Sequence, residues 1–170
     1  ALVVLTATLP AAARTYVKDT RVYSAFDETR SSVESIAYGE GTWLALGWDG
    51  QLLRSANGTD WSTVFGAGDD SPLAFLETAQ TVLDYGDGTW VAMATKGWFG
   101  ARSTDNGATW TRITQDAFPP VLHDTSDRVW TNFVGYVKDR FVIAGQNSLL
   151  LTSSDGATWN ELTTAPLGHL

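Results

Sequence analysis

The sequence predicts an all-β fold made of repeated units of four short antiparallel strands. A turn that ends in tryptophan recurs three times, with Gly58, Gly107 and Gly156 spaced 49 residues apart (107 − 58 and 156 − 107). Between the turns, short segments rich in aromatic and β-branched residues are separated by Gly, Asn and Asp, as in strands joined by tight connections. A fixed period of this size is typical of repeat proteins, in which each unit buries its apolar face against the next.

A predicted strand hairpin precedes each of these turns. Ile36–Gly47 and Val82–Ala94 share the pattern Tyr-Gly-acid-Gly-Thr-Trp, and a degenerate third copy covers Phe133–Gly145. The aligned tyrosines are Tyr38, Tyr85 and Tyr136. Glycines in the first two copies supply the positive φ angles of a tight hairpin. The third copy has Val137–Arg140 instead, which predicts a different type of turn there.

Each unit predicts four strands, which in the first unit cover residues 35–38, 43–47, 51–55 and 61–65. Four antiparallel strands in about 40 to 50 residues are typical of a β-propeller blade. We therefore predict blades over residues 32–66, 80–115 and 129–165, with a strand-forming or docking segment at 1–31 and a tail at 166–170. Propellers have about four to eight blades. An incomplete propeller, or part of a larger one, is therefore expected, completed by other chains or by the remainder of a longer polypeptide.

The turn Ser103-x-Asp105-x-Gly107-x-x-Trp110 resembles the Asp-box, or BNR repeat, of sialidase-like propellers and many bacterial and phage proteins. The resemblance covers most of residues 35–162 and implies a structural element, whose acid bonds the turn amides while its tryptophan packs between blades. Asp and Asn close turns on nearby backbone N–H groups, and tryptophan buries a large apolar area. The predicted structural positions are Ser55, Asn57, Gly58, Trp61, Ser103, Asp105, Gly107, Trp110, Ser153, Asp155, Gly156 and Trp159.

Composition and charge exclude several functions. Eleven basic against nineteen acidic residues give a net charge of −8, which disfavours nucleic acid or an anionic membrane as partner. The absence of cysteine excludes disulfides and thiol chemistry. With only two histidines, a histidine-rich metal site is not expected. No segment is long enough to span a bilayer, and we expect neither a cofactor nor a metal.

A ligand or partner surface, if the chain has one, is expected on the parts that the repeat does not require. The connections 66–79 and 115–128 occupy the same place in successive units, so they should emerge on the same face. Exposed aromatics beside Asp or Asn are typical of sugar-binding surfaces. The candidate surface residues are Trp48, Asp49, Trp98, Phe99, His123 and Trp130. Packing of Trp48 and Trp98 over a neighbouring blade or chain is the alternative, and we favour it.

Catalysis is disfavoured by what the resemblance would require. Sialidase-like chemistry implies an arginine triad, a tyrosine nucleophile paired with Glu, and an Asp. Arg54 and Arg102 precede their turns, but no arginine stands at the matching Leu150 or Leu151. Carboxylates at glycosidase separation could come from the loops, although loop acids are more often solvated. Those candidates are Asp69, Asp70, Asp124 and Asp127.

We therefore predict a noncatalytic structural or interaction module in a multi-chain assembly such as a phage tail or virion appendage, where repeats of this kind are met. A secreted or cell-surface glycan-binding propeller is the alternative. A fragment of a sialidase-like glycoside hydrolase is a third, less favoured interpretation.

Overall fold

The computed structural model describes residues 32–48, 50–66, 68, 71–76, 80–125 and 130–162. No described helix is long and apolar enough to cross a membrane. The strands are β1 (Val33–Gly39), β2 (Thr42–Gly47), β3 (Leu52–Ser55), β4 (Ser62–Phe65), β5 (Thr81–Gly86), β6 (Thr89–Ala94), β7 (Gly100–Ser103), β8 (Thr111–Ile113), β9 (Thr131–Tyr136), β10 (Phe141–Gly145), β11 (Leu150–Ser153) and β12 (Asn160–Glu161). Three 3₁₀ helices connect them: η1 (Ala74–Leu76), η2 (Gln115–Ala117) and η3 (Pro120–Thr125).

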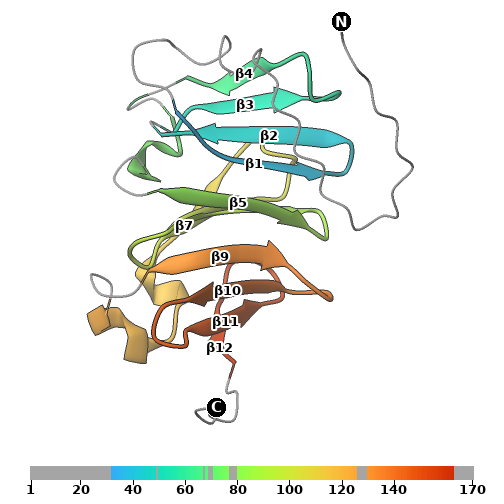
Figure 1. The fold of residues 1–170 in the computed structure, drawn as a ribbon. Coiled ribbons are helices and arrows are strands. Elements are labelled where there is room, and N and C mark those ends of the chain that lie inside the picture. Colours follow the sequence, from blue (N-terminus) through green and yellow to red (C-terminus); the bar gives the residue numbers. More distant parts are fainter. Residues whose placement is uncertain are drawn as a thin grey trace, which may run out of the picture.

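The strands form three four-stranded antiparallel sheets, which we call blade 1 (β1–β4), blade 2 (β5–β8) and blade 3 (β9–β12). Within each blade the strands are neighbours in chain order. The first strands β1, β5 and β9 lie side by side, and the blades spread away from them (Figure 1). The predicted all-β fold of four-stranded repeats is confirmed, and no described sheet closes on another.

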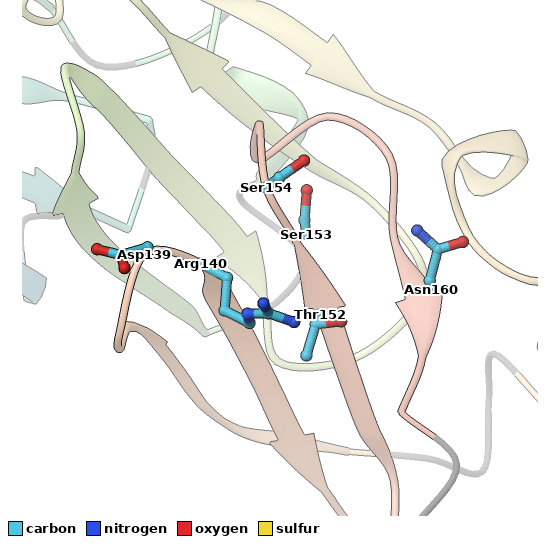
Figure 2. A pocket seen from close by; sticks show the side chains of 6 residues that line it. All are labelled: Asp139, Arg140, Thr152, Ser153, Ser154 and Asn160. Carbon is cyan, nitrogen blue, oxygen red and sulfur yellow. The ribbon is translucent and has the colours of Figure 1, made fainter.

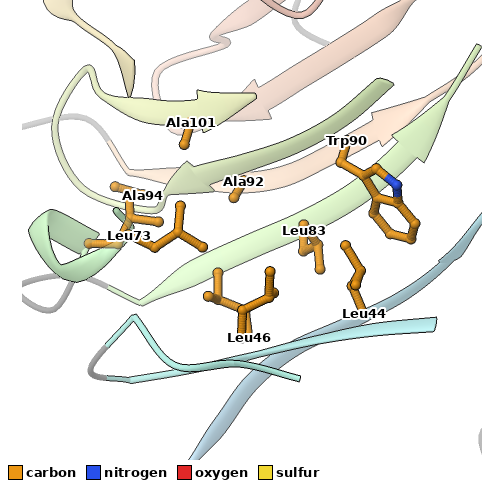
Figure 3. Packing of buried hydrophobic residues seen from close by; sticks show 10 residues of the cluster. Leu44, Leu46, Leu73, Leu83, Trp90, Ala92, Ala94 and Ala101 are labelled. Carbon is orange, nitrogen blue, oxygen red and sulfur yellow. The ribbon is translucent and has the colours of Figure 1, made fainter. Parts of the chain in front are cut away.

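Each blade has two faces because successive side chains of a strand point to opposite sides. We call the face toward the preceding blade the leading face, and the face toward the following blade the trailing face. The core between blades 1 and 2 joins a trailing face to a leading face and also takes in Leu73 and Leu76 from the η1 loop (Figure 3). Its main sheet residues are Leu44, Leu46 and Leu52 of blade 1 and Leu83, Trp90 and Ala92 of blade 2.

The core between blades 2 and 3 is built in the same way. Val91 and Met93 on the trailing face of blade 2 share one buried cluster with Val134 and Phe141 of blade 3. Phe118, from the loop after η2, joins this cluster. Each inter-blade loop therefore contributes apolar side chains to one of the two cores, so part of each loop is buried inside the fold.

All three hairpins between the first two strands of a blade use the same turn. Both central residues have positive φ, the pattern of a type I′ turn, at Glu40 and Gly41 (47° and 77°), Asp87 and Gly88 (47° and 74°), and Lys138 and Asp139 (46° and 67°). In blade 3, the Val137 N–H donates to the Arg140 carbonyl at 2.8 Å. The prediction of a different turn in blade 3 was wrong. A two-residue connection between twisted strands requires this backbone, and the paired strands hold it even without glycine.

Candidate functional site

The three tryptophan-ending turns, turn 1 (55–61), turn 2 (103–110) and turn 3 (153–159), are each closed by their first serine. The serine hydroxyl accepts the N–H of the turn glycine in every copy. The glycine nitrogen to serine Oγ distances are 2.9 Å for Gly58 and Ser55, 2.9 Å for Gly107 and Ser103, and 2.8 Å for Gly156 and Ser153. Each serine also donates to the Asn57, Asp105 or Asp155 side chain two residues later. The repeated residues therefore form one repeated hydrogen-bond pattern.

Asp105 uses its carboxylate within turn 2. Its Oδ1 accepts the Thr109 N–H at 2.9 Å and the Ser103 hydroxyl at 2.8 Å, and its Oδ2 accepts the Thr109 hydroxyl at 2.5 Å. The bonds from Thr109, followed by the bond from Ser103, lower the pKa of Asp105 to about 2 from its ordinary 3.8. The carboxylate is therefore ionised at neutral pH and has the hydrogen-bond partners of a structural group.

Turns 1 and 3 close in the same way with different charge. In turn 1 the Asn57 amide oxygen accepts from the N–H groups of Thr59 and Asp60 at 2.9 and 2.8 Å. In turn 3, burial raises the pKa of Asp155, but bonds from the Thr158 and Ala157 N–H groups and the Ser153 hydroxyl, with the charge of Arg102, lower it overall. Turn 1 thus has a neutral amide at the position of Asp105 and Asp155, and the Asn57 amide N–H donates to Asp60 Oδ2 at 2.7 Å.

Turns 2 and 3 also contact the preceding blade. The Arg54 guanidinium of blade 1 donates to the Asn106 carbonyl at 2.5 Å, and the Asn106 amide donates to the Thr42 hydroxyl at 2.8 Å. A Cβ at Gly107 would lie 2.7 Å from Leu44 Cδ1, and one at Gly156 would lie 2.5 Å from Val91 Cγ2. Turns 2 and 3 therefore pack against the blade that precedes their own.

The turn tryptophans are buried to different degrees. Trp159 is 2% exposed and stacks on Phe118, with ring centroids 6.1 Å apart and planes 10° apart. Trp61 and Trp110 are half-buried, and their indole N–H groups donate to the Gly58 and Gly107 carbonyls at 3.2 Å. Only the third tryptophan is a fully buried core residue.

Three of the candidate surface residues lie in packed positions. Trp98 is 3% exposed against Phe118, with centroids 5.4 Å apart, so it does not belong to an exposed surface. Half-buried Phe99 packs against Phe75, with centroids 6.1 Å apart. His123 Nε2 lies 3.0 Å from the Phe118 carbonyl. Phe118, which sequence reasoning missed, organises this region, and its only signal was an aromatic residue before two prolines.

Trp48 and Trp130 are the exposed members of the set, at 39% and 42%, and they belong to the regions of blades 1 and 3. Asp49 lies outside the described residues. A shallow polar pocket of about 190 Å³ occurs elsewhere, on blade 3, with the Arg140 guanidinium beside Thr152 (Figure 2). Its lining residues are Asp139, Arg140, Thr152, Ser153, Ser154 and Asn160. None of the six candidate surface residues is among them.

Of the groups that sialidase-like catalysis would need, the structure describes the arginine positions that precede the turns. Strand register places Thr152, rather than Leu150 or Leu151, at the position of Arg54 and Arg102, which corrects the sequence alignment. Arg54 is engaged by turn 2. Among the described residues, no group of three or more His, Cys, Asp or Glu side chains is placed to hold a metal. Asp69, Asp70 and Asp127 lie outside the described residues, as does the side chain of Asp124.

Comparison with known proteins shows the fold. Neither a protein-family model nor a curated protein sequence matches this chain. The structure is similar to that of the β-propeller protein YCF48 from Cyanidioschyzon merolae, with a TM-score of 0.58 and 15% identity over 81% of this chain and 39% of that one. The computationally designed Ika4 protein aligns with a TM-score of 0.49 and 10% identity over 82% of this chain and 78% of its own. The phage phi92 endosialidase aligns with a TM-score of 0.42 and 13% identity over 79% and 26% of the two chains. The chain spans 39% of the length of the YCF48 structure, and together the sheets and this likeness show a β-propeller-type fold.

Proposed function

We propose that this chain is a noncatalytic structural or interaction module whose tryptophan-ending turns are Asp-boxes. Its partners are other protein chains of an assembly such as a phage tail or virion appendage, or the remainder of a longer polypeptide. The observation that carries the proposal is that the polar side chains of the repeated turns make hydrogen bonds that hold the fold together. Asp105 closes its own turn, and Arg54 holds that turn on the neighbouring blade.

Exposed apolar side chains on the two end blades support a role in protein contacts. Ile36 and Tyr38 on blade 1 are 41% and 54% exposed, and Phe133 and Val137 on blade 3 are 40% and 47% exposed. Residues at equivalent positions between the blades are buried or packed, as Leu83 is at 4%. Apolar surface gathered on sheet faces favours association with another protein surface.

Light scattering on the purified chain tests this proposal. We expect a discrete particle heavier than the 18.4 kDa chain, and no turnover of a panel of sialosides and polysaccharides. Hydrolysis of any member of the panel by the folded chain would overturn the noncatalytic assignment. A strictly monomeric chain over the whole concentration range would count against an assembly component.

Glycan binding at a virion or cell surface is the second candidate, favoured by the exposure of Trp48 and Trp130. Aromatic faces stack on sugar rings, and tryptophan adds a polar N–H to a large apolar ring. A glycan array with Trp48→Ala and Trp130→Ala would reveal it as lost retention with an unchanged melting temperature. Trp98→Ala is the matched control, because its buried ring predicts a loss of stability instead.

A further inference from the structure

The trailing face of blade 1 holds turn 2 with one hydroxyl and one guanidinium. The Arg54 guanidinium donates to the Asn106 carbonyl, and the Asn106 amide donates to the Thr42 hydroxyl at 2.8 Å. Thr42 lies two residues before Leu44 on β2, and Arg54 pairs with Leu44 from β3, so the three side chains share one face of the sheet. We call the threonine and the arginine the turn clamp.

Blade 2 has the same pair of residues. Thr89 and Arg102 occupy the two clamp positions in the strand register. Turn 3 packs on this face, because a Cβ at Gly156 would lie 2.5 Å from Val91 Cγ2. In both interfaces between blades, a threonine and an arginine therefore lie on the face that receives the turn of the following blade.

Blade 3 keeps these two chemical groups and exchanges their positions. Arg140 follows the hairpin turn directly, where blades 1 and 2 have the threonine. Thr152 occupies the position of the arginine. The Arg140 guanidinium lies beside Thr152, and the Asp139 carboxylate points away from it (Figure 2). Among the described residues, neither the Arg140 nor the Thr152 side chain has a hydrogen-bond or ion-pair partner.

The exchanged pair lines the shallow pocket of about 190 Å³ on blade 3. Arg140 is exposed, and the pocket wall adds the hydroxyl of Ser154 and the amide of Asn160. A guanidinium is a permanent cation that donates only, whereas a hydroxyl both donates and accepts. The pocket therefore offers the two groups with which blade 1 holds the carbonyl and the amide of an asparagine.

Val137 argues against a consecutive blade as the occupant. In blades 1 and 2 this position is Gly39 or Gly86, and the tyrosine of the following blade lies directly over the glycine. A Cβ at Gly39 would be 2.0 Å from Tyr85 Cγ, and one at Gly86 would be 1.9 Å from Tyr136 Cγ. Val137 fills this space in blade 3. The pocket therefore suits a turn that arrives without a blade docked as blades 2 and 3 are.

A second copy of this chain offers no suitable turn among its described residues. Turns 2 and 3 already pack against the preceding blade. Turn 1 contains Asn57 and Gly58, but Asn57 Nδ2 donates to Asp60 Oδ2 at 2.7 Å within its own turn. The centre of the sheet face beside turn 1 is also closed, since Ala45 and Leu53 are 0% exposed.

We propose that Arg140 and Thr152 bind an Asn-Gly turn on a different protein chain, as the turn clamp of blade 1 binds turn 2. The guanidinium donates to the turn carbonyl, and the threonine hydroxyl accepts the asparagine amide. In turn 2, Asp105 closes the loop, so that Asn106 has its carbonyl and amide available for the clamp. The partner's turn therefore carries an acid, an asparagine and a glycine in succession. This inference rests on the proposed interaction function and identifies the surface and the partner's chemistry.

A cyclic peptide with the sequence of turn 2, residues 103–110, is the probe for the full chain. Cyclisation keeps the turn closed before binding. An NMR titration should show saturable binding, with a dissociation constant of about 1 mM or tighter, and should shift the signals of Arg140 and Thr152. Arg140→Gln should weaken binding about tenfold or more, because it removes a charge-assisted hydrogen bond. Lys138→Gln is the matched control, since it removes the same charge from an adjacent residue outside the pocket.

Moving the arginine within the pocket gives a second readout. Arg140→Thr should abolish binding, and the double variant Arg140→Thr, Thr152→Arg should regain it, because it recreates the arrangement of blade 1. The variant Arg140→Thr, Val121→Arg restores the net charge at a residue of η3 that is 71% exposed, and it should not regain binding. If the exchanged variant does not fold, Arg140→Lys replaces it and should bind more weakly than the wild type, since lysine lacks the planar fork of donors.

Four outcomes overturn the proposal. The first three are no saturable binding by the folded chain up to about 10 mM peptide, binding that survives Arg140→Gln, and binding regained through Val121→Arg. The fourth is self-association of the wild type that Arg140→Gln dissociates, which would assign the pocket to a second copy. Failure of the proposed function has a separate sign, namely turnover or glycan retention by the wild-type chain.

Discussion

The substitution Gly39→Ala places one methyl group at the contact between blades 1 and 2. The new Cβ would lie 2.0 Å from Tyr85 Cγ, 2.1 Å from Cδ1 and 2.7 Å from Cβ. Carbon atoms pack at about 3.5 to 4.0 Å, so a displacement of roughly 1.5 Å is needed. Rotation of the ring cannot clear its own Cβ and Cγ, so β5 itself must shift.

We expect this shift to lower the free energy of unfolding by about 3 kcal/mol, near the upper end for overpacked interiors. The displaced ring would also disturb the packing of Tyr85 on Trp90 and the bond from its hydroxyl to Glu40. Urea unfolding followed by circular dichroism measures the change. Gly66→Ala is the matched control, because its Cβ meets nothing within 4 Å and its φ is outside the left-handed region. It should stay within about 0.5 kcal/mol of the wild type.

The double variant Gly39→Ala, Tyr85→Ala separates this clash from a general effect on β1. Removing the ring removes the clash, so the double variant should be less destabilised than the sum of the single variants by about 1 to 3 kcal/mol. Additive effects, or a cost for Gly39→Ala no larger than that for Gly66→Ala, would refute the close contact between Gly39 and the Tyr85 ring.

Three further perturbations test the turns and the hairpins. Trp159→Ala should cost about 3 to 5 kcal/mol in urea unfolding, clearly more than Trp61→Ala, and equal losses would contradict the burial difference. The pKa of Asp105 is about 2 in the folded chain, against an ordinary 3.8. The stability that this carboxylate adds to the fold is present above about pH 4 and is lost as pH falls through about 2. Asp105→Asn should therefore flatten the acid side of a stability–pH curve, and an unchanged slope would show that the carboxylate bonds contribute nothing. Burial, followed by the bond to Glu40, raises the pKa of Tyr85 above 10. The stability that the neutral hydroxyl adds to the fold is therefore present below pH 10 and should fall as pH rises through the raised pKa. The variant Tyr85→Phe should weaken this loss at alkaline pH.

The fold could be predicted because the residues that repeat along the chain determine local structure, namely turns and strands. Glycines 49 residues apart and alternating aromatic segments led to three four-stranded sheets, and the strand expected at 43–47 is observed at Thr42–Gly47. The hairpin of blade 3 was not predictable by composition, because strand pairing imposes positive φ on Lys138 and Asp139 despite the absence of glycine.

The surroundings of the candidate residues depend on contacts that sequence does not reveal. Trp98 is buried by Phe118, which arrives from a separate loop twenty residues later in the chain (118 − 98). Gly39 and Gly86 stand inside a hairpin motif, where they suggest turn chemistry rather than a contact with the next blade. Only the spatial arrangement shows that each receives a tyrosine.

The row of first strands has a consequence for how this protein unfolds. The contacts between neighbouring blades are densest along the first strands, between β1 and β5 for blades 1 and 2 and between β5 and β9 for blades 2 and 3. A linear chain of nearest-neighbour couplings does not need to melt as one cooperative unit, since each interface adds its own term to stability. A destabilising substitution at the interface between blades 1 and 2 should therefore unfold blade 1 more readily, while blades 2 and 3 stay associated. Hydrogen exchange would then report two protection levels along the chain, with their boundary between β4 and β5.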